Sequence, residues 1–211
     1  MDGSFSWADS PRHELNGAFI MDLFKDLPFD DPVGYAYNYY LQFPALTILF
    51  YPPLYSFILA PMYAICGVTE ESVLLRGSVC YTCSAVGVYS LARNGLSQVD
   101  SFSTAVIIVL APEITFWGRQ VMLEVPVYAF LIWGIYFFVE YIKTEKIYQL
   151  YLSIALLVLG LYIKTPIAFI AIPLLFVLFS KRGLDVFNDK HTYITAFIAI
   201  VYIFPLVYIC F

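Results

Sequence analysis

The stretch ADSPRHELNGAFIMDL, residues 8–23, places acidic, basic and imidazole side chains close together in a chain that is mostly apolar. Asp9 precedes Arg12 by three residues and His13 by four, so a helix here would bring the three side chains near one face or its N-cap. A carboxylate held at a membrane surface could remove a proton from a hydroxyl group, which is general base catalysis. The simpler alternative is that Asp9 only caps the helix.

Cations that could bind a phosphate occur much further along the chain, at Arg119 and Lys164. A guanidinium group binds phosphate oxygens through two parallel hydrogen bonds, whereas an ammonium group acts as a point charge. Glu124 could orient Arg119 or an acceptor, and Arg76 could pair with an acidic group or a phosphate. The structural alternative for such residues is that they extend to the membrane interface, where Arg76 would contact lipid headgroups.

The elements that must position these side chains are membrane helices. Hydrophobic residues make up 61% of the 211-residue chain and charged residues 13%, whereas soluble domains are about half apolar and about a quarter charged. This composition excludes a soluble domain, and since there is no basic run, nucleic acid is not an expected partner. Cys80 and Cys83 have the spacing of some metal or redox sites, but without a second pair we interpret them as small buried residues.

We predict one all-α domain over residues 1–211, a polytopic transmembrane helix bundle. Residues 1–70 form an outer loop with two interfacial juxtamembrane helices, one capped by Ser10 and one over 53–67, joined by a loop rich in Pro, Tyr and Asp. Residues 71–211 hold about six transmembrane helices, because a span needs about 20 mostly apolar residues. Their approximate ranges are 72–92, 101–118, 122–142, 147–163, 165–180 and 192–211.

The distribution of Lys and Arg predicts which loops face the cytoplasm. Basic residues favour short cytoplasmic loops, and here they fall in the loops after the first, third and fifth predicted spans, which all lie on one side. The opposite side collects the outer loop and the remaining polar span ends, so we expect the site to face outward from the plasma membrane. The basic loop residues are Arg93, Lys143, Lys146, Lys181, Arg182 and Lys190.

Four stretches occur in an order and spacing that resemble the N-terminal half of the GT-C glycosyltransferases that use polyprenyl-phosphate sugars. This group includes protein O-mannosyltransferases, the lipid A aminoarabinose transferase and RgtA/B/C/D-like enzymes. This chain departs from the family pattern at two positions. Tyr51 replaces the histidine of the family's HPPL-type stretch, and Thr165 replaces the glycine of its TKGP-type turn. The stretches are ADSPRHELNGAFIMDL, YPPLYSFILAPMYAICGVTEESVLLRGSV, LAPEITFWGRQVMLEVPVYAFL and GLYIKTPIAFIAIPLL.

The resemblance implies an inverting glycosyltransferase that moves a hexose or pentose from a polyprenyl-phosphate carrier to a hydroxyl group of a glycan, lipid or protein. It implies that Asp9 is the catalytic base and that Arg119 and Lys164 hold the departing phosphate. No metal is assigned, and no cofactor beyond the donor sugar-lipid is identified. His13 could contact a substrate or be a solvated helix-surface residue. The further substrate-binding candidates are Glu124, Arg76, His13 and Tyr51.

Two other classes of protein stay open. A lipid or sugar transporter, or a flippase, predicts ionisable residues near mid-span on facing helices, whereas Glu113 and Glu140 lie toward span ends. An inactive membrane fragment is the third class, because relatives begin with a span before the Asp loop and continue beyond the sixth predicted span. From this comparison we expect the chain to be truncated at both ends and to come from a bacterial or archaeal plasma membrane.

Overall fold

The computed structural model describes residues 9–48 and 50–210, and this part of the chain contains helices and no strand. The prediction of an all-α membrane helix bundle is confirmed. Two of the helices, η1 and η2, are short 3-10 helices that continue into α9 or follow it. The elements are α1 (Ser10–Asp26), α2 (Pro32–Gln42), α3 (Leu54–Cys66), α4 (Glu70–Ala92), α5 (Gln98–Val109), α6 (Pro112–Gly118), α7 (Glu124–Thr144), α8 (Ile147–Leu161), η1 (Thr165–Ile170), α9 (Ala171–Arg182), η2 (Gly183–Asn188) and α10 (Lys190–Cys210).

The first helix, α1, packs against α3 at a position where only glycine fits. A Cβ atom on Gly17 would lie 2.8 Å from the Cβ of Leu59, so the missing side chain lets the two backbones approach closely. The helix begins at Ser10, and its N-cap is Asp9, one residue earlier than the sequence predicts. Its apolar face carries the buried side chains of Phe19 and Ile20.

The prediction of a loop between the two juxtamembrane helices is wrong, because this segment contains a third helix, α2. The Asp31 side chain accepts a hydrogen bond from the Gly34 backbone N–H at 2.8 Å, and Pro32 occupies the first turn. Both are helix-start signals that outweigh the loop-like composition. Two hydrogen bonds hold α2 against α1, from Tyr35 to Asp26 (2.8 Å) and from Tyr39 to Asp22 (3.0 Å).

The membrane helices follow the predicted segments closely, with one break. The segment predicted over 101–118 is two helices, α5 and α6, which meet at an angle of 61°. By length and apolar composition, α7 and residues 165–188 are long enough to cross a membrane, and the bent pair would make a third span. The total of about six spans stays a prediction. In the bundle, α7 packs against both α4 and α8, α4 packs against α5, and α8 packs against α10.

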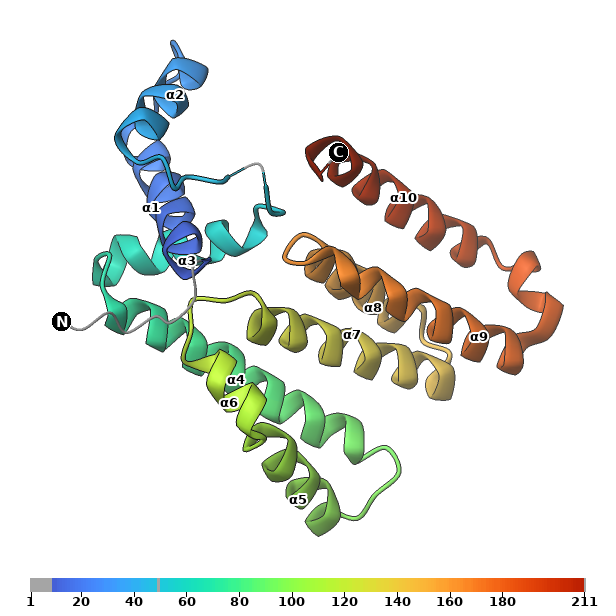
Figure 1. Cartoon of the computed structure of the whole chain (residues 1–211). Coiled ribbons are helices and arrows are strands. Elements are labelled where there is room, and N and C mark those ends of the chain that lie inside the picture. The colour runs from blue at the N-terminus through green and yellow to red at the C-terminus, as the bar shows by residue number, and fades with distance from the viewer. Residues whose placement is uncertain (1–8, 49, 211) are drawn as a thin grey trace.

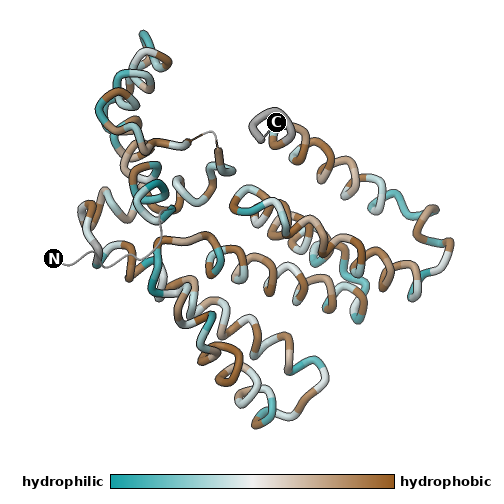
Figure 2. The backbone as a smooth tube through the Cα atoms, in the orientation of Figure 1, coloured by the Kyte–Doolittle hydropathy of each residue, from teal (hydrophilic) through white to brown (hydrophobic). Residues whose placement is uncertain are grey.

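The bundle has two distinct ends (Figure 1). At one end lie α1 to α3, α6 and the start of α7. At the other end are the turns between α4 and α5, α7 and α8, and α9 and α10, and the Lys143 ammonium there donates to the Asn94 carbonyl at 2.8 Å. Hydrophobic residues dominate the bodies of α7 to α10, while hydrophilic residues gather in α1, α2 and the turns (Figure 2). The chain is therefore an integral membrane protein with polar groups concentrated at its two ends.

Candidate functional site

Asp9 lies at the start of α1, but its carboxylate does not cap the helix. One oxygen, Oδ1, accepts a hydrogen bond from Arg12 Nη1 at 3.2 Å, and the other, Oδ2, accepts one from the Tyr51 hydroxyl at 3.4 Å. The side chain is 36% exposed. The carboxylate is thus held by two donors while remaining open to a substrate, and the capping alternative has no support in this geometry.

His13 follows Asp9 on α1 and is buried, with 2% of its surface exposed. Its ring centroid lies 4.8 Å from that of Tyr51 and 5.5 Å from that of Tyr55. The interpretation of His13 as a solvated surface residue is therefore wrong. Burial lowers the pKa of His13 to about 4, so the imidazole is neutral at neutral pH. The charged side chains that also act on the pKa of His13 are Asp9 and Glu124, which raise it, and Arg76 and Lys164, which lower it.

Glu124 and Lys164 form an ion pair between the start of α7 and the start of η1. The Lys164 ammonium lies 2.6 Å from Glu124 Oε1, and the lysine side chain is 38% exposed. The second carboxylate oxygen of Glu124 is buried without a hydrogen-bond partner among the described residues. A hydrogen bond from the Leu54 N–H to the Tyr162 carbonyl, at 3.0 Å, joins the start of α3 to the segment that precedes Lys164.

Arg76 is buried in α4 and is 2% exposed. Its guanidinium donates to the carbonyl oxygens of Gln120 at 3.3 Å and Met122 at 3.5 Å. It also lies over the Tyr55 ring, 4.9 Å from the centroid. The sequence predicted that Arg76 contacts an acidic group, a phosphate or a lipid headgroup. In the structure its guanidinium instead binds two backbone carbonyls and so joins α4 to the turn between α6 and α7.

Arg119 does not join the other predicted site residues. It is the C-cap residue of α6 and is exposed. Its side chain lines a pocket of about 350 Å³ together with Gly77, Ser78 and Tyr81 of α4. The next residue, Gln120, turns inward and is buried. The two neighbours therefore differ in exposure, and Arg119 is not among the charged residues that act on the pKa of His13.

The residues that the structure brings together are named the polar cluster below. Sequence reasoning did not include Arg12 or Tyr55 among the site residues, although Arg12 holds Asp9 and Tyr55 contacts both His13 and Arg76. The one available signal was spacing, because Tyr55 follows Tyr51 by four residues. In the described part of the chain, no three His, Cys, Asp or Glu side chains are grouped closely enough to hold a metal ion. The polar cluster consists of Asp9, Arg12, His13, Tyr51, Tyr55, Arg76, Glu124 and Lys164.

The polar cluster combines a proton acceptor with a positive charge. The Asp9 carboxylate is partly exposed and anchored by two donors, and the Lys164 ammonium is also partly exposed. A carboxylate of this kind can accept a proton from a hydroxyl group, while an ammonium group can stabilise an anionic leaving group. Together with the apolar helices, these features define an integral membrane protein with a candidate group-transfer site at one end of its bundle.

Comparison with known proteins defines the family. Residues 51–209 match the family described as dolichyl-phosphate-mannose-protein mannosyltransferase. Because the match covers more than half of the 211 residues, the chain belongs to this family and is a membrane glycosyltransferase of the GT-C type, a group that uses polyprenyl-phosphate sugars as donors. No curated protein sequence and no solved structure matches the chain. The match includes Tyr51, Arg76, Arg119, Glu124 and Lys164, and it begins after Asp9 and His13.

Proposed function

We propose that the chain transfers a hexose or pentose, with mannose as the first candidate, from a polyprenyl phosphate to an acceptor hydroxyl on the non-cytoplasmic side of the membrane. Asp9 would take the hydroxyl proton as the hydroxyl oxygen attacks the anomeric carbon. The bond between that carbon and the phosphate oxygen would break, and polyprenyl phosphate would leave with the bonding electron pair. The family supports the class of reaction, and the position of Asp9 in the polar cluster carries the assignment of the base.

The environment of Asp9 suits a base that must be held without being neutralised. Burial, together with the negative charge of Asp9, raises the pKa of Tyr51, so the phenol stays protonated and can donate to the carboxylate. Arg12 is 44% exposed and forms an ordinary surface ion pair with Asp9, which is weak enough to exchange with a substrate. The replacement of the HPPL-type histidine by Tyr51 thus keeps a hydrogen-bond donor at that place.

Lys164 is the residue of the polar cluster that we propose to stabilise the departing phosphate. Its ammonium is partly exposed and has two further N–H groups beyond the one directed at Glu124. Glu124 would orient the ammonium, because its own side chain is only 17% exposed. His13 and Arg76 are buried, so their proposed part is to shape the wall of the site and to hold the turn before Glu124 in place.

The direct test is the substitution Asp9→Asn in membranes that contain the full chain. Consumption of a polyprenyl-phosphate-mannose donor, followed with a labelled sugar, should fall by about 10²- to 10⁴-fold, which is the usual contribution of a general base. Asp185→Asn is the matched control, because Asp185 is an exposed carboxylate in η2 at the other end of the bundle. Donor consumption that persists in Asp9→Asn at the level of the control would remove Asp9 from the mechanism.

A further inference from the structure

An apolar cleft with a volume of about 340 Å³ lies between α9 and α10, with α8 forming its floor. Helix α10 packs against α8, and α9 precedes α10 through η2, so α9 and α10 form the two rims (Figure 1). The floor residues Leu157 and Val158 are buried, whereas Leu175 on α9 is 51% exposed and Ile200 on α10 is 65% exposed. The cleft is therefore closed toward the bundle and open on the side that faces lipid.

The length of the cleft matches one leaflet of a membrane. On α10 its lining runs from Thr192 to Ile203, which is about 17 Å at the rise of an α-helix. One leaflet contributes half of a hydrocarbon core that is about 30 Å thick. Both α8 and α10 start at the end with the turn between α9 and α10, so the cleft begins there. Its polar lining residues, Thr192 and Thr195, also lie at that end.

Two lysines stand at this mouth of the cleft. Lys181 follows the lining residue Leu178 by three positions on α9, so the two side chains share a helix face. Lys190 is the first residue of α10, two positions before Thr192. Both lysines are exposed, and neither forms an ion pair within residues 9–48 and 50–210. Each ammonium group is thus available to an anion as a point charge.

The nearby acids do not neutralise these lysines. The Asp189 carboxylate is held by Arg182 at 2.8 Å and accepts the backbone N–H of His191 at 2.9 Å. Asp185, in η2, is an exposed carboxylate. Because Asp189 is balanced by Arg182, two lysines face one remaining acid, and the mouth of the cleft is positively charged.

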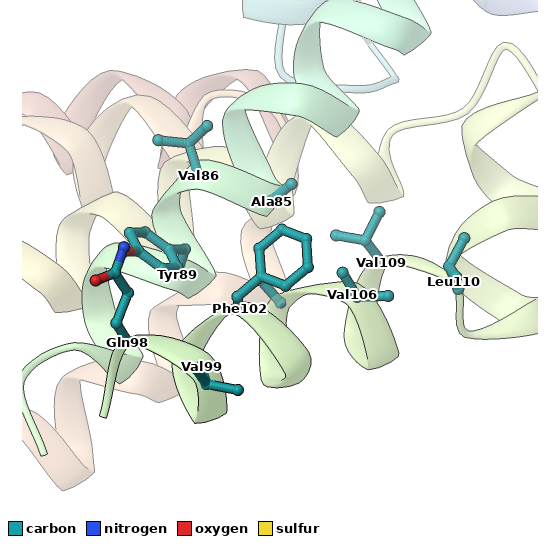
Figure 3. Close-up of a pocket in the computed structure, with 10 residues that line it drawn as sticks. Ala85, Val86, Tyr89, Gln98, Val99, Phe102, Val106, Val109 and Leu110 are labelled. Atoms are coloured by element: carbon teal, nitrogen blue, oxygen red, sulfur yellow. The ribbon is translucent and has the colours of Figure 1, made fainter. Parts of the chain in front are cut away.

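The groove between α4 and α5 is the contrasting case (Figure 3). It is larger, at about 730 Å³, but its wall is open, since Val99 is 73% exposed and Phe102 is 64% exposed. Its end near the basic turns carries the amide of Gln98, and the first turn of α5 contains Asp100. The guanidinium of Arg93, in the preceding turn, donates to a backbone carbonyl. This groove therefore lacks the charge that would select an anionic headgroup.

We infer that the cleft between α9 and α10 binds an anionic membrane phospholipid, with one acyl chain along α8 and the phosphate on Lys181 and Lys190. The acyl chain satisfies the apolar lining, and the negative headgroup complements the two lysines. The bound lipid would join the rims formed by α9 and α10 and so stabilise the position of α10. The cleft opens at the end opposite the polar cluster, so this site is separate from the proposed sugar transfer and goes beyond it.

The test measures lipid binding to the purified full chain in detergent by native mass spectrometry, with phosphatidylglycerol and phosphatidylcholine that have the same acyl chains. We expect phosphatidylglycerol to bind more tightly. Lys181→Gln and Lys190→Gln should each weaken its binding by about fivefold, the usual contribution of one lysine near an anionic lipid. Phosphatidylcholine, whose headgroup has no net charge, should be much less affected. Lys143→Gln, which alters an exposed lysine in the turn after α7, is the control and should bind like the unmodified chain.

A second pair of variants tests the cleft itself. Ala199→Phe fills the cleft and should weaken binding of both lipids. Val106→Phe places the same ring in the groove between α4 and α5 and should leave binding of phosphatidylglycerol unchanged. If Ala199→Phe binds phosphatidylglycerol as the unmodified chain does, the lipid lies elsewhere and the inference is overturned.

Three further results would also overturn the inference. The first is unchanged binding of phosphatidylglycerol in the variant that carries both lysine substitutions. The second is displacement of phosphatidylglycerol by an equal concentration of farnesyl phosphate, which would make the cleft an isoprenoid site. The third is a dimer that forms without added lipid and is lost in Ala199→Phe, which would make the cleft a contact between copies of the chain. Asp9→Asn should retain lipid binding, so failure of the proposed base would leave this inference unaffected.

Discussion

The two ends of the bundle contain the same kinds of charged side chain in opposite environments. At the end with the basic turns, Arg182 pairs with Asp189 only seven residues away, and Arg93 donates to the nearby Leu96 carbonyl at 3.0 Å. In the polar cluster, Glu124 and Lys164 are 40 residues apart. Arg76 reaches across 44 residues to the Gln120 carbonyl and is almost completely buried. At the basic end, the contacts of Arg182 and Arg93 are thus local, and Lys143, which reaches Asn94 across 49 residues, is exposed. The polar cluster differs because it also buries a charge between distant segments.

This difference indicates that the charges at the two ends have different roles. Exposed basic residues in short turns cost little free energy because they stay solvated, and their known effect is to orient a membrane protein. Burying a charge costs free energy unless it is paired, so buried charges in membrane proteins usually belong to functional sites. The contrast predicts that matched substitutions at the two ends will have unequal effects on transfer and on stability.

After Asp9→Asn, the largest of these effects is expected for Lys164→Gln. If Lys164 stabilises the departing phosphate, its loss should lower the turnover number for sugar transfer by about 10²- to 10³-fold, as loss of one transition-state donor usually does. Lys143→Gln, at the basic end, should leave turnover unchanged. Radiolabelled sugar transfer at saturating donor measures both. Equal turnover in the two variants would break the proposed division between the ends.

Arg76→Met should lower the free energy of unfolding by about 3 kcal/mol, because the Gln120 and Met122 carbonyls would lose buried donors. Arg93→Met should cost less than about 1 kcal/mol, since Arg93 is exposed. Thermal unfolding in detergent, followed by circular dichroism, compares the two. The opposite order would mean that the turn between α6 and α7 does not depend on Arg76.

Acid should destabilise the end that contains His13. The pKa of His13 is lowered by burial from 6.5 to about 4 in the folded chain, so the unfolded chain binds more protons between these values and unfolding becomes easier as the pH falls. The loss should be about 2 kcal/mol between about pH 7 and about pH 5.

The variant His13→Gln should remove this loss, and His191→Gln, which alters the histidine bonded to Tyr151 at the basic end, should retain it. Unfolding by a denaturant at several pH values provides the measurement. If the pH dependence of stability disappears in His191→Gln and persists in His13→Gln, the titrating group is His191 at the basic end, which contradicts the prediction.

Tyr51→Phe should have the smallest effect. Its hydrogen bond to Asp9 is long, at 3.4 Å, so its removal should lower transfer by about fivefold, corresponding to about 1 kcal/mol. Tyr148→Phe alters an exposed tyrosine of α8 near the basic end and should leave transfer as it is. A loss of about 10²-fold or more in Tyr51→Phe would mean that the phenol takes part in the chemistry directly.

Much of the fold could be predicted from the sequence, because long apolar segments in lipid must be helices. The predicted and observed limits of α4, α7 and α8 agree within about two residues. The break before Pro112 was missed since both halves are apolar, and α2 was missed since its cap, Asp31, lies in a segment whose Pro, Tyr and Asp content predicted a loop. Local composition hid both features.

The candidate site was less predictable, because its geometry depends on contacts between distant segments. Sequence reasoning named Asp9, Glu124 and Lys164, and the structure brings them around His13. It could not show that Arg119 is exposed while Gln120 is buried, or that Arg76 binds backbone carbonyls. These outcomes depend on how α6 joins α7, which no local pattern encodes.

The central claim is that the polar cluster and the basic turns face opposite sides of the membrane, with the polar cluster outside. Single cysteines at Arg12 and at Lys143, in a chain whose native cysteines are replaced by alanine, test it directly with a membrane-impermeant maleimide on intact cells. Both positions are exposed at their respective ends. We expect Arg12→Cys to be labelled in intact cells and Lys143→Cys only after permeabilisation. Labelling of both from the same side, or the reverse pattern, would contradict the account.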